Sequence, residues 1–292
     1  MIVASKREKA SYYLFLIPAF LIFLVFIFGP MIYSFVLSLF EYNMMTIKEP
    51  KFIGFDNFTT LFNTPVFGTI MKNTAVYTLF TVPLSMMCGL GIALLINNKL
   101  IVHKNFYKAC YYIPYVSSMV AVAIVFSLLF NASTNGIINQ ILISLGLKPV
   151  GWLSDARWAM PIVILLSVWK DLGYVMVIYT GGILAISQDI YEAASLDPIS
   201  PWKKLTKITL PLLRPTTLFL LVTQTINSFQ VFTPVQVMTN GGPGYSTTTI
   251  VTYLYQKGFD EYKMGMASAI AVVMFVILLI LSIIQNKVGS RQ

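Results

Sequence analysis

Residues 191–215 read YEAASLDPISPWKKLTKITLPLLRP, a polar and basic stretch that separates two long apolar runs. Charged side chains cost several kcal/mol each in hydrocarbon, so this stretch is not expected to cross the membrane core. Its Glu-Ala-Ala sequence favours a helix, which the Asp197–Pro198 pair should end. Ser200 followed by Pro201 is typical of the start of a second helix. We predict that this helix runs to about Ile208 and ends at Leu210–Pro211, giving a helix–turn–helix on the membrane surface.

The composition places the rest of the chain in a bilayer. Of its 292 residues, 57% are hydrophobic and only 11% are charged, and the mean hydropathy is +0.76. Six apolar runs are long enough to cross a hydrocarbon core of about 30 Å. They are Tyr13–Ser38, Thr74–Ile96, Tyr107–Phe130, Ala159–Leu184, Thr216–Met238 and Met264–Ile284. We therefore expect an all-α polytopic membrane protein with six transmembrane helices.

The distribution of charge predicts the orientation of these helices. With the N-terminus in the cytoplasm, the loops on that side carry 12 lysines and arginines against four acidic residues, whereas the outer loops carry seven against six. This asymmetry follows the positive-inside rule and puts both termini in the cytoplasm. It also accounts for the net charge of +9, so nucleic-acid binding is not supported. We expect a cytoplasmic tail at residues 1–12 and one transmembrane domain at residues 13–292, with a cytoplasmic loop at residues 187–215.

The loop carries a resemblance to a known family. The matching residues are Glu192, Ala193, Ala194, Asp197, Ile208, Leu210 and Pro211, which stand at the spacing of the EAA motif. In this the chain resembles the membrane-spanning permease subunits of bacterial ATP-binding-cassette importers, whose EAA loop docks into a cleft of the ATPase subunit. Pro198 stands where the family usually has glycine, and proline cannot adopt the positive φ that glycine allows. The alternative interpretation is an ordinary basic loop on the cytoplasmic side.

Two outer segments resemble the carbohydrate branch of these permeases: IGFDNF at residues 53–58, in a predicted short interfacial helix, and TNGGPG at residues 239–244. The resemblance implies a type I importer permease fold in the bacterial cytoplasmic (inner) membrane, and a sugar or oligosaccharide as the transported substrate. The implied partners are a second, homologous permease in a heterodimer, two ATP-binding-cassette ATPase subunits, an external or periplasmic sugar-binding protein and membrane lipid. Closure of the ATPase dimer would move the loop and rock the helices between inward-open and outward-open states.

The sequence offers no chemistry of its own. The glycine cluster Gly241–Gly244 lacks the Lys-Ser/Thr that follows in a nucleotide-binding loop, so ATP and Mg²⁺ are expected on the partner ATPase and no cofactor on this chain. His103 is the single histidine, and Cys88 and Cys110 lie apart in apolar runs, where we interpret them as small core residues. We therefore predict no metal site and no catalytic residues, and a transport subunit rather than an enzyme.

Lys170 and Asp171 are the only charges deep within a predicted span, since Lys108 lies at the cytoplasmic edge of the third span. Such residues usually face a bundle interior or a water-filled cavity, and they mark a transport path. Neighbours on a helix point about 100° apart, so each needs a partner on another helix, on a second subunit or on the substrate. The alternatives are a lysine that reaches toward the outer surface, or a purely structural pair. A further alternative is an ion-coupled secondary transporter that uses Lys170 and Asp171 as its relay, although the inverted repeats frequent in such proteins are not evident.

Other polar side chains in the spans are candidates for the same path. On the fifth span, Thr223, Asn227 and Gln230 form one stripe, and their amides and hydroxyl could bind sugar hydroxyls or neighbouring helices. Tyr115 and Ser118 lie on the third span, and Tyr174 lies one turn from Lys170 on the fourth. The resemblance implies that these parts of spans three to five line the sugar pocket in those family members that have one.

Overall fold

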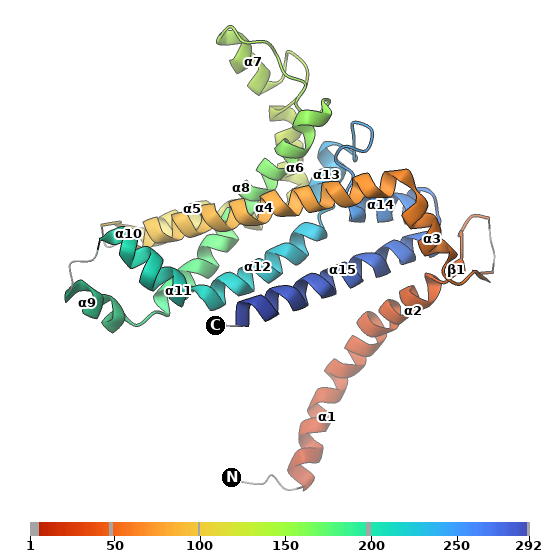
Figure 1. The fold of residues 1–292 in the computed structure, drawn as a ribbon, viewed down its shortest axis with the longest axis horizontal. Coiled ribbons are helices and arrows are strands. Elements are labelled where there is room, and N and C mark those ends of the chain that lie inside the picture. The colour runs from red at the N-terminus through yellow and green to blue at the C-terminus, as the bar shows by residue number, and fades with distance from the viewer. Residues whose placement is uncertain (1–5, 47–48, 99, 197–199, 291–292) are drawn as a thin grey trace. The chain divides into compact units, whose positions relative to one another are not determined.

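The computed structural model describes residues 6–46, 49–98, 100–196 and 200–290, which fall into two compact units (Figure 1). Unit one comprises the described residues up to Thr64 together with Leu254–Phe275, and unit two comprises Pro65–Tyr253 together with the described residues from Val276 onward. The secondary structure is helical apart from one pair of two-residue antiparallel strands among the described residues, β1 (Phe40–Glu41) and β2 (Lys51–Phe52). The expected all-α class is thus correct except for this pair.

Unit one contains the first apolar run and the segment that follows it. Its helical elements are α1 (Lys6–Phe23), the π-helical turn η1 (Leu24–Phe28), α2 (Gly29–Leu37), α3 (Asp56–Asn63), the π-helical turn η3 (Gln256–Asp260) and the first turns of α15 (Met264–Ser290). The short helix predicted after the first span is present as α3. The Asn57 amide fastens it to the end of α2 by donating to the carbonyl oxygens of Ser38 and Phe40 at 2.8 and 2.9 Å.

Unit two holds the remaining helices. They are α4 (Pro65–Asn97), α5 (Lys104–Val116), α6 (Met119–Leu129), α7 (Ile137–Ser144), α8 (Ala156–Leu184), α9 (Gln188–Leu196), α10 (Pro201–Lys204), the π-helical turn η2 (Leu205–Thr209), α11 (Leu210–Leu212), α12 (Arg214–Phe229) and α13 (Thr233–Met238). Helix α14 (Ile250–Tyr255) begins in unit two, and the last turns of α15 return to it.

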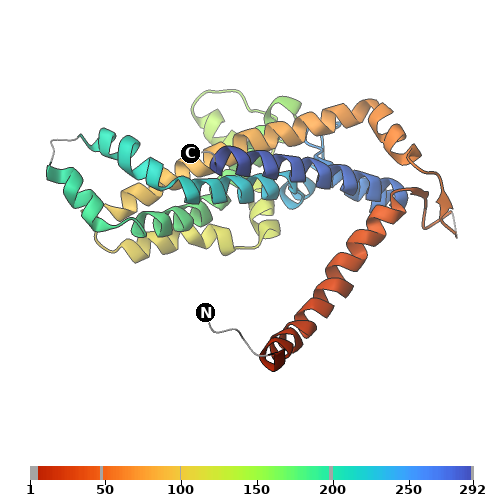
Figure 2. The same ribbon diagram turned by 60° about the horizontal axis from the view of Figure 1, so that its bottom comes forward.

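Helices α4, α8 and α12 form the core of unit two through close approaches at small residues. A Cβ at Gly89 of α4 would lie 2.8 Å from the Cβ of Val175, and one at Gly182 of α8 would lie 2.9 Å from Leu213 at the start of α12. Glycine in these positions lets helices meet at backbone distance, as it does between helices in membranes. The end of α8 therefore lies beside the start of α12, and α9 and α10 project from that end of the unit in both views (Figures 1 and 2).

Five of the six predicted spans correspond in position to apolar helices of the structure. Five described helices or helix pairs are long and apolar enough to cross a membrane: Leu14–Leu37, Pro65–Asn97, Ala156–Leu184, Arg214–Met238 and Met264–Gly289. The third predicted span, Tyr107–Phe130, is not one continuous helix, because α5 and α6 meet at an angle of 91°. The count is therefore five, or six if this bent pair is one crossing.

The bend in the third predicted span has a local origin. Pro114 lacks the N–H that would continue the helix ladder, and Ser117 ends α5 in an extended conformation with φ −68° and ψ 151°. Ser118 then caps α6 by accepting a hydrogen bond from the Ala121 N–H at 3.5 Å. A run that is apolar enough by composition to cross the membrane thus contains the signals that end one helix and begin the next.

Candidate functional site

The cytoplasmic loop of the sequence analysis folds as two short helical segments. Helix α9 spans Gln188–Leu196, and the Gln188 amide donates to the Glu192 carboxylate at 2.8 Å, an i, i+4 pair on the α9 surface. Ser200 caps α10 as predicted, since its hydroxyl accepts a hydrogen bond from the Lys203 N–H at 3.4 Å, and Pro201 is the first helical residue. The predictions made for Asp197 and Pro198 lie outside the described residues.

The predicted end of the second helix at Leu210–Pro211 is wrong. The chain stays helical through α10, η2 and α11 as far as Leu212. The cause is η2, a π-helical turn in which the Leu210 N–H reaches back five residues to the carbonyl of Leu205. Because Pro211 has no N–H and its ring crowds the carbonyl four residues earlier, a widened turn immediately before it accommodates the ring without ending the helix.

Tyr191 fastens the two segments to each other, a role that the sequence analysis did not assign. Its hydroxyl lies 3.2 Å from the Thr209 hydroxyl at the end of η2. The Lys204 ammonium donates to the Tyr191 carbonyl at 3.4 Å and lies 5.2 Å from the centre of the Tyr191 ring. Helix α9 and the α10–η2 segment are therefore joined by polar contacts and by a cation–π contact.

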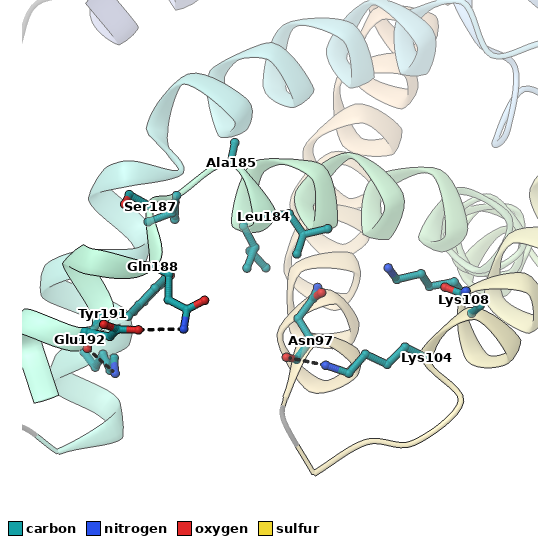
Figure 3. A pocket seen from close by; sticks show the side chains of 13 residues that line it. Asn97, Lys104, Lys108, Leu184, Ala185, Ser187, Gln188, Tyr191 and Glu192 are labelled. Carbon is teal, nitrogen blue, oxygen red and sulfur yellow. Dashed lines mark hydrogen bonds between the residues drawn. The ribbon is translucent and has the colours of Figure 1, made fainter.

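A pocket of about 760 Å³ lies between this loop and the start of α5 (Figure 3). Three lysines line it, Lys104 and Lys108 from α5 and Lys204 from α10, against the single carboxylate of Glu192. Lys104 is held by a hydrogen bond from its ammonium to the Asn97 carbonyl at 3.2 Å. The pocket is therefore electropositive, as expected for a surface on the cytoplasmic side of a membrane.

The EAA residues within the described chain differ in exposure. Glu192 and Ala193 are exposed on α9, whereas Ala194 and Ile208 are half-buried. Leu210 and Pro211 are exposed, and Leu210 is 37% accessible. The loop thus exposes a carboxylate, a methyl group and an apolar edge, whereas the side chains of Ala194 and Ile208 are partly packed inside the chain.

The second candidate region surrounds the break between α5 and α6. The Lys170 side chain of α8 is 7% exposed, and its ammonium donates to the carbonyls of Pro114, Tyr115 and Ser117 at 2.9, 2.7 and 2.7 Å. The same ammonium lies 5.7 Å from the centre of the Tyr115 ring. The partner that the sequence analysis required for Lys170 is therefore the backbone of the neighbouring helices.

Two tyrosines and a carboxylate stand beside Lys170. The rings of Tyr115 and Tyr174 stack with centroids 5.0 Å apart and planes 22° apart. Asp171, half-buried on α8, lies near the buried side chain of Gln224 on α12. The structure thus brings together four of the predicted residues and adds Gln224, which is one position away from the stripe found in the sequence.

The other predicted path residues are not joined to this group. Ser118 is exposed and caps α6. On α12, Thr223 is half-buried and donates to the Phe219 carbonyl at 2.8 Å, whereas Asn227 and Gln230 are exposed. No hydrogen bond or ring contact within the described parts of the chain links these side chains to Tyr115 or Tyr174.

The two cysteines are placed differently from the prediction. Cys88 and Cys110 are both exposed on the chain. Their interpretation as core residues is wrong, because an apolar helix in a membrane protein also turns apolar side chains toward lipid and partner subunits, so hydrophobicity does not indicate the interior of the chain.

Comparison with known proteins covers nearly the whole chain. The family described as "Binding-protein-dependent transport system inner membrane component" matches residues 82–292. The arabinooligosaccharides transport system permease protein AraP of Bacillus subtilis (strain 168) is 34% identical over 284 residues, 97% of this chain and 90% of that protein. The lactose transport system permease protein LacF of Rhizobium radiobacter is 33% identical over 293 residues, 97% of this chain and 96% of that protein.

The fold is similar to that of a solved importer. A chain in the crystal structure of a bacterial ABC transporter involved in the import of the acidic polysaccharide alginate has a TM-score of 0.84 and 29% identity, covering 98% of this chain and 96% of that one. A second crystal structure, of the alginate transporter in complex with an alginate pentasaccharide-bound periplasmic protein, also has a TM-score of 0.84, with 27% identity.

Proposed function

We infer that this chain, which belongs to the family of inner-membrane components of binding-protein-dependent transport systems, is a membrane-spanning subunit of an ATP-driven importer of a sugar or oligosaccharide. The observation that carries this inference is the EAA loop, folded as exposed helices beyond the ends of α8 and α12. The chain crosses the bacterial cytoplasmic membrane six times, with α5 and α6 as one bent crossing and both termini in the cytoplasm. ATP hydrolysis belongs to a separate subunit.

The complete importer contains further chains. We expect a second, homologous permease in a heterodimer, two ATPase subunits that bind ATP and Mg²⁺, and an external sugar-binding protein. The similarity to an importer permease solved with its periplasmic protein supports the last of these. The ion-coupled alternative loses its relay, because the ammonium of Lys170 already donates to three carbonyls.

The geometry of the loop suits force transmission to the ATPase. Glu192 offers an exposed carboxylate for a directed contact, and Ala193 beside it allows close approach. Tyr191 joins α9 to Thr209 and Lys204, so a push on α9 is transmitted to the α10–η2 segment and, through α11, to α12. Contacts that hold two helices as one body are what a coupling element requires.

The sugar path is proposed to run past the stacked rings of Tyr115 and Tyr174. Aromatic faces bury the apolar C–H surface of a sugar ring, and carboxylates and amides bind its hydroxyls. The carboxylate of Asp171 and the amides of Asn227 and Gln230 are such groups, and Thr223 adds a hydroxyl. The two amides are exposed on α12, outside the packed interior of this chain. A second permease facing this surface would complete the path.

Reversing the charge of Glu192 tests the coupling role. In the reconstituted importer, Glu192→Lys should lower sugar accumulation at least about tenfold while ATP hydrolysis continues, because the contact that couples hydrolysis to helix motion is lost. The control is Asp189→Lys, which makes the same reversal on the same helix outside the motif and should retain most of the uptake. Normal uptake by the Glu192 variant would contradict the coupling role.

A further inference from the structure

We propose that Lys170 is a positioning residue that holds the α5–α6 break against α8. Because its N–H donors are used in this way, they do not bind a substrate carboxylate, and the path takes a neutral rather than an acidic sugar. This inference rests on the proposed function, because it concerns the substrate of the same path. An acidic sugar is bound best by a cation with free N–H donors, and Lys170 is the only cation among the residues proposed for the path.

The donors of Lys170 are fully used. A lysine ammonium has three N–H donors and no acceptor. Each of the three is matched by one carbonyl, those of Pro114, Tyr115 and Ser117, all within 2.9 Å. With only 7% of the residue exposed, a sugar carboxylate could reach the ammonium only after one of these hydrogen bonds broke.

The site has a structural need for this cation. A helix end leaves its last carbonyls without partners, and in a membrane water does not supply them. The break after Val116 ends α5 in this way, in a span that turns by 91°. The negative end of the α5 dipole also favours a positive charge at this point. Lys170 therefore stabilises the bend and keeps α5 attached to α8.

The same contact positions a ring of the path. Tyr115 provides one of the three carbonyls. The centre of its ring lies 5.7 Å from the ammonium and 5.0 Å from the centre of the Tyr174 ring. Releasing Lys170 frees the backbone of Tyr115 and so disturbs the stacked pair. Lys170 thus acts on the substrate through Tyr115, without touching it.

The groups that remain for a sugar are neutral or negative. Among the described residues proposed for the path, these are the phenols of Tyr115 and Tyr174, the uncharged side chains on α12, and the carboxylate of Asp171. A carboxylate accepts hydrogen bonds from sugar hydroxyls and repels a second carboxylate, most strongly where water is scarce. Neutral sugars therefore fit this surface, and uronic-acid sugars do not.

The first experiment uses the assembled importer in proteoliposomes, with Lys170→Met and Lys170→Arg as a matched pair, and rates are expressed per assembled complex. For the sugar that is taken up, Lys170→Met should lower the maximal rate about tenfold or more, because the bend that carries Tyr115 is no longer held. KM should stay within about threefold, because Lys170 itself makes no contact with the substrate. Lys170→Arg keeps the charge and donors and should restore part of the rate. A large rise in KM at an unchanged maximal rate would overturn the proposal.

The second experiment holds even if Lys170→Met fails to assemble. Xylo-oligosaccharides of one length, with and without a glucuronic acid branch, are offered to wild type and to Asp171→Asn. Wild type should accumulate the neutral form at least about tenfold faster, and Asp171→Asn should raise the relative uptake of the acidic form. Equal uptake of both forms by wild type, or no shift in Asp171→Asn, would overturn the inference. No ATP-dependent uptake of any sugar would instead contradict the proposed function.

Discussion

Gly173→Ala should loosen the junction of α5 and α8. Gly173 faces the backbone of α5: an added Cβ would lie 2.7 Å from the Cα of Tyr112, and closer still to the carbonyl oxygen of Tyr111. An ordinary contact between carbon atoms needs about 3.4 Å or more, so α5 must retreat by about 0.7 Å or more. Overpacking of this kind costs about 1–3 kcal/mol, against a gain of up to about 1 kcal/mol from the better helix propensity of alanine.

Because the clash is with backbone atoms, we expect a cost of about 2–3 kcal/mol, which less about 1 kcal/mol of propensity leaves a net loss of about 1–2 kcal/mol. This loss corresponds to roughly a tenfold change in the folded-to-unfolded ratio. The retreat of α5 also shifts Tyr115 away from Tyr174 and lengthens the hydrogen bonds of Lys170, so uptake should fall as well. The measurements are thermal inactivation of the purified complex and sugar uptake per complex. A lower midpoint of inactivation and slower uptake are expected together.

Gly181→Ala on the same helix is the matched control. An added Cβ there meets nothing within 4 Å, so only the propensity gain applies, and stability should stay the same or rise slightly. If Gly173→Ala were as stable and as active as Gly181→Ala, the close approach of α5 to α8 and its role in positioning Tyr115 would be refuted.

Three further predictions follow from individual contacts. Asn139→Ala should destabilise the segment between α6 and α8 by about 2 kcal/mol, because the buried Asn139 amide oxygen accepts hydrogen bonds from the Val150 N–H at 3.0 Å and the Trp152 indole at 2.9 Å. Limited proteolysis of this segment should be faster in the variant, and unchanged cleavage would count against the prediction. Ser200→Ala should destabilise the start of α10 by about 0.5–1 kcal/mol, because the Lys203 N–H loses its side-chain acceptor. Ser200→Asp, which keeps an acceptor at the cap position, is the control, and hydrogen exchange of the Lys203 amide should be faster only in Ser200→Ala. Burial of the Glu261 carboxylate opposes its ionisation, but Lys257 and Lys263 outweigh burial and hold its pKa below the usual value. Its contribution to stability is therefore present above the unfolded-state pKa of about 4.3 and lost as the pH falls through the lower folded pKa, so acid should increase hydrogen exchange around η3 in wild type but not in Glu261→Gln.

Sequence reasoning predicted the membrane helices and the helical segments of the polar loop because their signals are local. A run of about 20 apolar residues predicts a crossing wherever it occurs. The order Ser200–Pro201 predicts a helix start from two adjacent residues, and α10 begins there. The same local reading failed at Pro211, because it could not foresee the π-helical turn that widens the helix immediately before it.

The partners of the polar groups were decided only by the tertiary structure. The charge of Lys170 was visible in the sequence, but its three acceptors lie 53 to 56 residues earlier in the chain. They stand at a helix break that the average hydrophobicity of the segment does not reveal. Tyr191 and Thr209 are 18 residues apart, and their contact depends on how α9 folds against η2. Composition thus predicts that this chain crosses the membrane, and the motif marks the loop that we propose meets an ATPase. The packing of helices decides which polar groups are already satisfied, and so which remain for a sugar, because a hydrogen bond depends on distances that the order of residues does not contain.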